Sequence, residues 1–324
     1  MKRFFVVFLL LICICYCYVF GDEKPSFSFT TDFSLMNGRI SEFVFDEACK
    51  NTDNLVSRLD WDVKNIPVFN YAFDFAFCKH AFFGFAFKTA FPKASGAMQD
   101  YDWLNSTETS WHNDPPDQLT NYSYHDNRLS CYYLLGVSAG ANIYLPFEFC
   151  LKPFAAYEFE YISFDAENGY KKYKADNFKK ESFYGKVISY QQEINSFLLG
   201  LTVQTTAVKN LFFSTTFMLS PWLTGINALD RHFHFTKQVC FYDTPRMTLQ
   251  LKADTKINYI IKDGHSLGIN GFLQYIPLSK GDTHSKSMDA LGNPVPGRWY
   301  KDPGAQGGTS RFLWSVGINY LYWF

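Results

Sequence analysis

Hydrophobic and polar residues alternate with a period of two along most of the chain, and no stretch beyond residue 21 has the spacing of an amphipathic helix. The clearest stripe lies at the C-terminus and consists of Phe312, Trp314, Val316, Ile318, Tyr320, Tyr322 and Phe324. The positions between them include Ser315, Gly317 and Asn319. Side chains of a β-strand point alternately to opposite faces, so this stripe predicts a strand with one apolar face.

Similar stripes and the turn residues between them predict about ten strands. Their ranges are 26–46, 54–78, 81–99, 121–145, 147–165, 186–205, 208–227, 237–261, 265–280 and 309–324. Tight turns alternate with long polar loops, which are predicted at residues 93–120, 166–185, 226–238 and 280–308. Short turns at one end and long loops at the other describe an antiparallel up-and-down meander.

The N-terminus begins with the basic pair Lys2-Arg3, which an apolar run from Phe4 to Phe20 follows. This arrangement is typical of a secretory signal peptide, which we assign to residues 1–21. An uncleaved membrane anchor is the alternative, because the run approaches the length that spans a bilayer. Residues 22–324 are predicted to form a single domain.

Composition narrows the class of protein. The chain has 324 residues, of which 19% are aromatic and 19% charged, and its mean hydropathy is -0.15. That mean excludes a bundle of transmembrane helices, while this many apolar residues exclude disorder. A net charge of -1 without a long basic run argues against a nucleic-acid partner. The five cysteines beyond residue 21 are odd in number and lack a Cys-x-x-Cys pair, so we expect neither a disulfide framework nor a zinc site.

An exported chain with such aromatic-rich, alternating strands is predicted to be a transmembrane β-barrel of the bacterial outer membrane. Lipid cannot satisfy the free edge of a sheet, so the strands have to close into a cylinder. Several strands exceed the roughly 9–11 residues that cross a bilayer, so the barrel should extend beyond the membrane on the long-loop side. A secreted β-sandwich is the alternative, although its strands would be shorter.

Two acidic motifs lie on the long-loop side. Asp100 and Asp102 lie where the third predicted strand meets its long loop, and Asp230 and His232 follow the seventh. On both strands the odd-numbered apolar residues face lipid, so these even-numbered residues are expected to point into the lumen. Strands three and seven are far apart in order, so the two motifs can face each other across the mouth.

Carboxylates and an imidazole that meet there can activate a water molecule. A histidine oriented by Asp230 can accept a proton from the water, and Asp100 can help to hold it. Bulges at Pro92 or Gly96 could reverse the inward parity of the aspartates. A solvated loop or a cation site is the alternative for the Asp-x-Asp pair.

The sequence resembles the omptin family, the integral outer-membrane endopeptidases of bacteria. The matching motifs include Leu59-Asp60-Trp61, Gln99-Asp100-Tyr101-Asp102-Trp103, Ser189-Tyr190-Gln191-Gln192 and Asp230-Arg231-His232. The resemblance implies a ten-stranded barrel that cleaves polypeptide substrates at a mouth facing the cell exterior. It implies that a water held between Asp100 and His232 attacks the peptide bond, that Asp230 orients His232, and that Asp102 completes the acidic pair. It implies no cofactor and no metal.

Substrate specificity departs from the family pattern. In omptins a glutamate on the first strand and an aspartate two residues before the catalytic aspartate bind a basic side chain at the scissile bond. Glu42 retains the first acid, whereas Ala228 stands at the second position. One carboxylate binds a cation more weakly than two, so we expect a relaxed preference for a basic residue before the cut. Pairing of Glu42 with Arg39 or Arg58 is the alternative.

The lipid-facing wall departs as well. Omptins bind lipopolysaccharide through basic residues of this wall, and Glu167 and Glu193 stand at two of those positions. Carboxylates there would repel lipid phosphates, so we expect contact with outer-membrane lipid without dependence on lipopolysaccharide.

Two other functional classes remain open at this point. The first is a non-catalytic outer-membrane barrel that acts as an adhesin or interaction protein, which an assay for peptide hydrolysis distinguishes from a protease. The second is a soluble secreted binding module, which would need no detergent for extraction.

Overall fold

The computed structural model describes residues 26–47, 54–104, 118–233, 238–262 and 264–324. The signal peptide predicted at residues 1–21 lies outside the described residues. Nearly all of the described chain is β-strand, and a short 3-10 turn spans Lys174–Asp176. No helix within these ranges is long and apolar enough to cross a bilayer.

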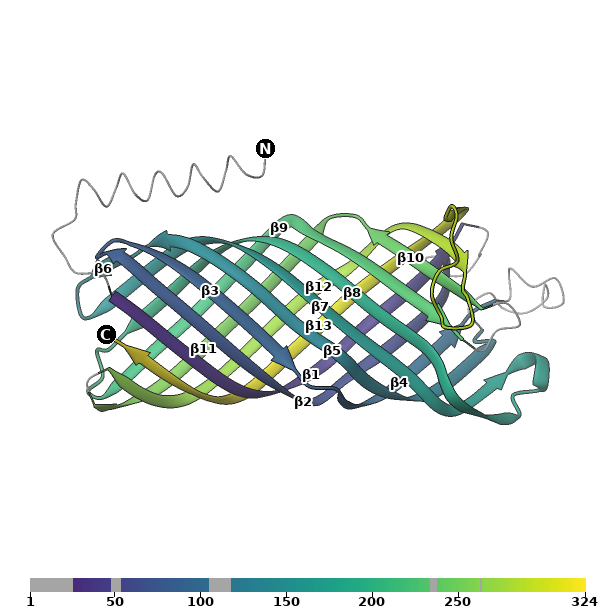
Figure 1. The fold of residues 1–324 in the computed structure, drawn as a ribbon, viewed down its shortest axis with the longest axis horizontal. Coiled ribbons are helices and arrows are strands. Elements are labelled where there is room, and N and C mark those ends of the chain that lie inside the picture. Colours follow the sequence, from purple (N-terminus) through teal and green to yellow (C-terminus); the bar gives the residue numbers. More distant parts are fainter. Residues whose placement is uncertain (1–25, 48–53, 105–117, 234–237, 263) are drawn as a thin grey trace.

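The strands form a single closed antiparallel sheet (Figure 1). They are β1 Ser26–Asp46, β2 Leu55–Cys78, β3 Ala81–Ala90, β4 Lys93–Asp102, β5 Asn121–Ala141, β6 Ile143–Leu145, β7 Phe149–Tyr173, β8 Lys180–Thr205, β9 Leu211–His232, β10 Val239–Pro245, β11 Thr248–Lys262, β12 His265–Ser287 and β13 Tyr300–Trp323. β4 continues β3, β6 continues β5 and β11 continues β10, so these segments make ten strands around the wall. β1 pairs with both β2 and β13, which closes the cylinder and confirms the predicted up-and-down barrel.

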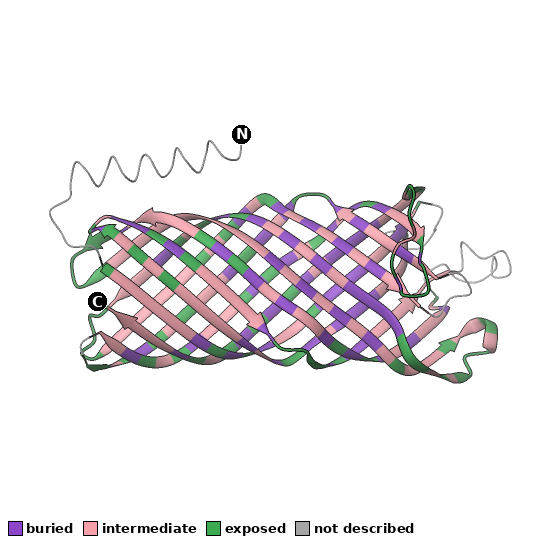
Figure 2. Cartoon of the chain, in the orientation of Figure 1, coloured by how far each residue is buried: buried purple, intermediate pink, exposed green. Residues whose placement is uncertain are grey.

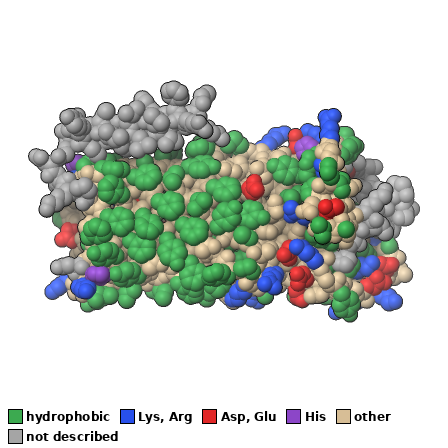
Figure 3. Space-filling view, viewed as in Figure 1, with side chains coloured by type: hydrophobic (Ala, Val, Ile, Leu, Met, Phe, Trp, Pro, Cys, Tyr) green, Lys and Arg blue, Asp and Glu red, His purple; other side chains and the backbone are tan. Residues whose placement is uncertain are grey.

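A belt of apolar side chains covers the outside of the barrel at the end where the chain terminates (Figure 3). On β13 the predicted stripe faces outward: Val316 and Ile318 are 59% and 63% exposed. Leu313 and Asn319, which belong to the alternate positions of the strand, face the lumen and are buried. Exposed apolar side chains this numerous are stable only against lipid, as in barrels that span a membrane. The belt therefore marks the membrane-spanning part, and charged side chains gather at the opposite end of the molecule.

The strands continue farther past the belt than the sequence pattern predicted. β7 runs to Tyr173 and β8 starts at Lys180, so most of the loop expected at 166–185 is a paired hairpin. β13 likewise starts at Tyr300, within the loop expected at 280–308. Past the belt the outer face meets water and carries polar residues, so the apolar alternation that identifies a strand is lost. The predicted extents of these two loops were wrong for that reason.

A layer of buried side chains fills the lumen in the middle of the barrel and beyond it toward the charged end (Figure 2). Trp61 stacks on Phe164 and Tyr190, with ring centroids 5.9 and 5.6 Å apart. Arg311 is buried as well, and its guanidinium donates to Glu160 over 2.5 Å. The middle of the barrel is therefore a packed core, which supports the mouth beyond it.

Candidate active site

The paired aspartates lie at the end of β4, past the apolar belt. Asp100 and Asp102 are opposite Leu59 and Ser57 of β2, and the Ser57 hydroxyl lies 3.3 Å from an Asp100 carboxylate oxygen, to which it donates. Asp100 also interacts electrostatically with Asp230 on the far wall. Both aspartates thus face the lumen, as their parity predicted.

The even positions still face inward at Asp100 and Asp102 because two irregularities between β3 and the end of β4 each reverse the parity. The even positions of β3 face inward up to Ala90, but after the break at Phe91 and Pro92 the buried residue is Ser95. A second shift follows between Ala94 and Ala97, where Gly96 has a φ of +79°. Glycine adopts this conformation without the steric cost that a Cβ would bring. The even positions then face inward again from Met98 onward.

The second pair lies at the end of β9, between β8 and β10. Asp230 is buried, and one of its carboxylate oxygens forms a short hydrogen bond with Nε2 of His232. The Phe241 ring of β10 packs edge-on against the imidazole, with the ring centroids 5.6 Å apart. A carboxylate on one side and an aromatic edge on another fix the orientation of the His232 ring.

The side chains of the two pairs interact electrostatically at one mouth of the barrel. Burial, then Asp102 and Asp230, raise the pKa of Asp100 well above its ordinary value. Burial also raises the pKa of Asp102, although Ser57 and His232 oppose this shift. Burial lowers the pKa of His232, but the charges of Asp230 and Asp102 outweigh it, so this pKa lies above its ordinary value. The four predicted residues therefore form one cluster of side chains that interact electrostatically.

Glu42 of β1 joins the same cluster. Its side chain is only 1% exposed, and its Oε2 has no hydrogen-bond partner among the described residues. Burial raises the pKa of Glu42 well above its ordinary value, and the charges of Asp230, Asp243 and Asp100 add to the shift. The alternative pairing with arginine is wrong, because the described ion pairs of the two arginines run to other carboxylates, Asp60 and Asp62.

Asp243 of β10 is a site residue that the sequence analysis missed. It is 3% exposed and lies directly opposite Ala228 in the β9–β10 pairing. In β11 the buried positions are even, so extrapolation along one continuous strand would point Asp243 outward. The break at Arg246 and Met247 reverses this parity, and Asp243 faces the lumen. An acidic residue near the loop end of a predicted strand was the available signal.

Glu167 and Glu193 belong to the outward-facing sets of β7 and β8, past the belt, as their parity predicted. Within the described ranges, no group of three or more His, Cys, Asp or Glu side chains is arranged to hold a metal ion.

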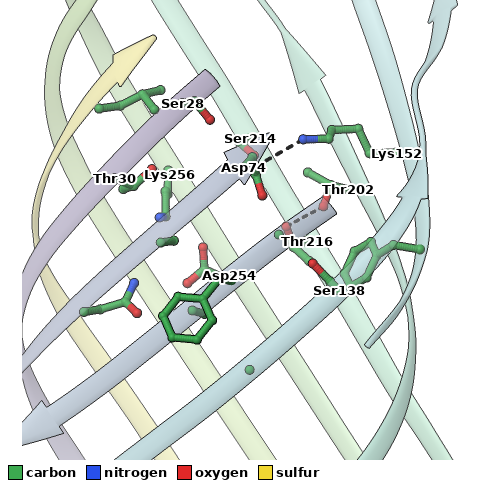
Figure 4. A pocket seen from close by; sticks show the side chains of 18 of the residues that line it. Ser28, Thr30, Asp74, Ser138, Lys152, Thr202, Ser214, Thr216, Asp254 and Lys256 are labelled. Carbon is green, nitrogen blue, oxygen red and sulfur yellow. Dashed lines mark hydrogen bonds and ion pairs between the residues drawn. The ribbon is translucent and has the colours of Figure 1, made fainter. Parts of the chain in front are cut away.

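A cavity of about 490 Å³ lies at the end of the lumen opposite the mouth, inside the belt (Figure 4). Its charged side chains include Asp74 and Lys152, which form an ion pair, and Asp254 and Lys256 nearby. None of the predicted site residues lines this cavity. The packed core around Trp61 lies in the middle of the lumen, between the two ends of the barrel.

The fold and the site together define a membrane-spanning β-barrel with a buried acid–histidine cluster at one mouth. The sequence profile of the omptin family matches residues 23–322. The chain therefore belongs to the omptin family.

Several known proteins resemble the chain. The outer membrane protease IcsP of Shigella flexneri is 24% identical over 301 residues, which are 90% of each chain. The outer membrane protease OmpP of Escherichia coli is 25% identical over 312 residues, which are 94% of this chain and 92% of OmpP. The plasminogen activator of Yersinia pestis is 24% identical over 225 residues, so the match covers 67% of this chain and 65% of that protein.

The crystal structure of the outer membrane protease OmpT from Escherichia coli has the same fold. It superposes with a TM-score of 0.78 at 18% identity, and the match covers 94% of this chain and 99% of OmpT. At this identity the likeness supports the barrel architecture alone.

Proposed function

We propose that this protein is an outer-membrane endopeptidase that hydrolyses peptide bonds with a water activated by His232 and Asp100. The observation that carries the proposal is the buried Asp230–His232 pair facing the Asp100–Asp102 pair across one mouth. Membership of the omptin family and the names of the relatives, two of which are outer membrane proteases, support it.

The hydrogen bond to Asp230 suggests how His232 works as a base. Nε2 carries the proton that it donates to Asp230, so Nδ1 is the nitrogen that accepts a proton from water. The water oxygen then attacks the carbonyl carbon of the substrate, and the imidazolium later returns the proton to the leaving amine. The charge of Asp230 stabilises the imidazolium in between.

The aspartate pair has two further roles in this proposal. Asp100 holds the attacking water opposite His232. Burial raises the pKa of Asp102, so this carboxyl can carry a proton and donate a hydrogen bond to the carbonyl oxygen as it becomes negative. The nucleophile is water, so the proposal contains no covalent enzyme intermediate.

The proposed substrates are polypeptides that reach the mouth from outside the cell. The position of the site past the belt, at the charged end of the barrel, supports this orientation. Glu42 is a buried carboxylate without a cationic partner among the described residues, and it supports a preference for a basic residue before the cut. This orientation makes intact cells able to cleave an added peptide that cannot cross the outer membrane.

Hydrolysis of a quenched fluorescent peptide with a central arginine tests the proposal. The purified wild-type barrel should cleave it, whereas His232→Ala and Asp230→Asn should each lower kcat by about 1,000-fold or more, as loss of a base or of its orienting carboxylate does in other hydrolases. Asp282→Asn is the control, because this exposed aspartate pairs with Lys301 on the outer surface. Normal cleavage by His232→Ala would exclude the mechanism, and no cleavage by the wild type would favour a non-catalytic adhesin.

A further inference from the structure

Two buried carboxylates at the mouth lack a cationic partner. Neither Glu42 nor Asp243 forms an ion pair with a described residue, and one oxygen of each, Oε2 and Oδ1, has no hydrogen-bond partner. They interact electrostatically with each other and with Asp230. Buried carboxylates are costly unless a cation or several donors satisfy them. Such an arrangement is expected of a binding site in which a cationic group of the ligand pairs with the carboxylates.

The neighbouring strands are shaped to hold Asp243 in this position. Thr283 lies opposite Asp243 on β12 and hydrogen-bonds to its side chain. On β13, a Cβ added to Gly307 would lie 2.2 Å from Cγ of Asp243, so only glycine leaves room for the carboxylate there. The two strands that follow β10 around one side of the wall, β12 and β13, thus accommodate an inward-facing acid on β10.

The position of Asp243 explains the alanine at residue 228. Ala228 is 2% exposed and is the direct cross-strand partner of Asp243. Directly opposite residues of an antiparallel pair have Cβ atoms roughly 4.5–5.5 Å apart, so a carboxylate on either one reaches the same part of the lumen. The acid absent from β9 is therefore present one strand further around the wall.

We propose that Asp243 is a specificity-determining residue that, together with Glu42, binds the basic side chain of the substrate before the cut. This inference rests on the proposed endopeptidase function and deepens it. It also replaces the expectation of relaxed specificity, because the pocket keeps two carboxylates. Two oxygens from different strands can receive the planar fork of a guanidinium, so we expect arginine to be favoured over neutral side chains of the same shape.

Paired substrates isolate the charge of that side chain. Two quenched peptides differ only in arginine or citrulline before the cut, since citrulline is the neutral near-isostere of arginine. The measured quantity is the ratio of their kcat/KM values. Asp243→Asn should lower this ratio about 10- to 100-fold, the loss expected for one charge-assisted hydrogen bond.

A second variant moves the carboxylate from β10 to the directly opposite position on β9. Asp243→Ala should lose the preference, and the double variant Ala228→Asp/Asp243→Ala should regain most of it, because the carboxylate returns to the same part of the lumen. Asp282→Asn, an acid-to-amide change on the outer surface of β12, should leave the ratio unchanged.

The outcomes separate this inference from the proposed function. A wild type that cleaves both peptides, with a ratio that Asp243→Asn leaves unaltered, overturns the role of Asp243 and leaves the endopeptidase intact. A wild type that cleaves neither peptide overturns both. A lowered ratio in Asp243→Asn together with recovery in the double variant supports the pocket.

Discussion

Five carboxyl groups share the mouth of the barrel with one imidazole, and no lysine or arginine among the described residues forms an ion pair with them. Burial raises the pKa of Glu42, Asp100, Asp102 and Asp243, and neighbouring carboxylates add to the shift for all but Asp102. Every ionised acid makes the next ionisation harder, so the charge of the mouth changes over the neutral pH range. A positively charged substrate group would favour the ionised forms.

The preference for arginine should therefore depend on pH. Burial, opposed by Thr283 and reinforced by Asp230, raises the pKa of Asp243 to about 7. The groups facing it are Glu42 on β1, Asp230 on β9, Thr283 on β12 and Gly307 on β13. Asp243 is neutral below this pKa and negative above it, while the guanidinium keeps its charge. The arginine-to-citrulline ratio of kcat/KM should rise between pH 5 and 9 and level off at the alkaline end.

Using a ratio removes the titration of the proposed catalytic groups, because both peptides meet the same His232 and Asp100. In Asp243→Asn the rise should shrink. A ratio that stays flat from pH 5 to 9 in the wild type would contradict a titrating pocket.

Odd or even position along each strand predicted correctly that most of these residues face the lumen. Asp243 is the residue that this rule missed, and the cause is local. Glu42, Asp100, Asp230 and His232 face inward as their even positions predicted. Asp243 was missed because the break at Arg246 and Met247 reverses the parity of its strand. A pattern read along one strand cannot reveal such a break, since its position depends on how the neighbouring strands pair.

Within a strand, β-bulges determine which side chains point into the mouth. In β9 two extra residues lie between the pairs Leu199–Leu219 and Ser196–Thr224, and Trp222 there has a φ of +55°. Two extra residues leave parity unchanged, so the prediction for Asp230 was right despite the irregularity. One extra residue, as near Gly96, reverses parity unless a second irregularity restores it.

The glycine on β13 offers a test at this scale. Gly307→Ala should push the Asp243 carboxylate out of place, because the new Cβ would lie 2.2 Å from its Cγ, and the arginine-to-citrulline ratio should fall toward that of Asp243→Asn. The strand backbone itself tolerates alanine, so the citrulline peptide should still be cleaved.

Gly225→Ala is the matched control, because a Cβ at that position meets no atom within 4 Å. An unchanged ratio in Gly307→Ala would show that the carboxylate has more freedom than its contacts indicate.

For the whole molecule, the sequence predicted the closed ten-stranded barrel but underestimated its height. The apolar stripes report only the strand segments that contact lipid. Past the belt, strands such as β7 and β12 are held by cross-strand hydrogen bonds and by the packed lumen. Neither interaction requires apolar residues on the outer face, so the sequence shows no alternating apolar pattern there. The core around Trp61 likewise depends on residues far apart in sequence.

The outer wall leads to a prediction about lipid. Glu167 and Glu193 place negative charge past the belt, where a basic wall would bind the phosphates of lipopolysaccharide. Purified protein in phospholipid bilayers without lipopolysaccharide should therefore cleave the arginine peptide as fast as protein to which lipopolysaccharide is added.

Glu193→Arg provides the comparison, since it should increase binding of lipopolysaccharide to the wall without altering the mouth. A wild type that is inactive until lipopolysaccharide is supplied would refute the expectation.

The packed lumen has a consequence for the fate of a cleaved chain. Trp61, Phe164 and Tyr190 close the path from the mouth toward the end inside the belt, so a polypeptide cannot thread through the cylinder. Both fragments have to depart by the opening through which the intact chain arrived. Under the proposed function, hydrolysis would therefore release both fragments on the side from which the substrate came, without carrying them across the membrane.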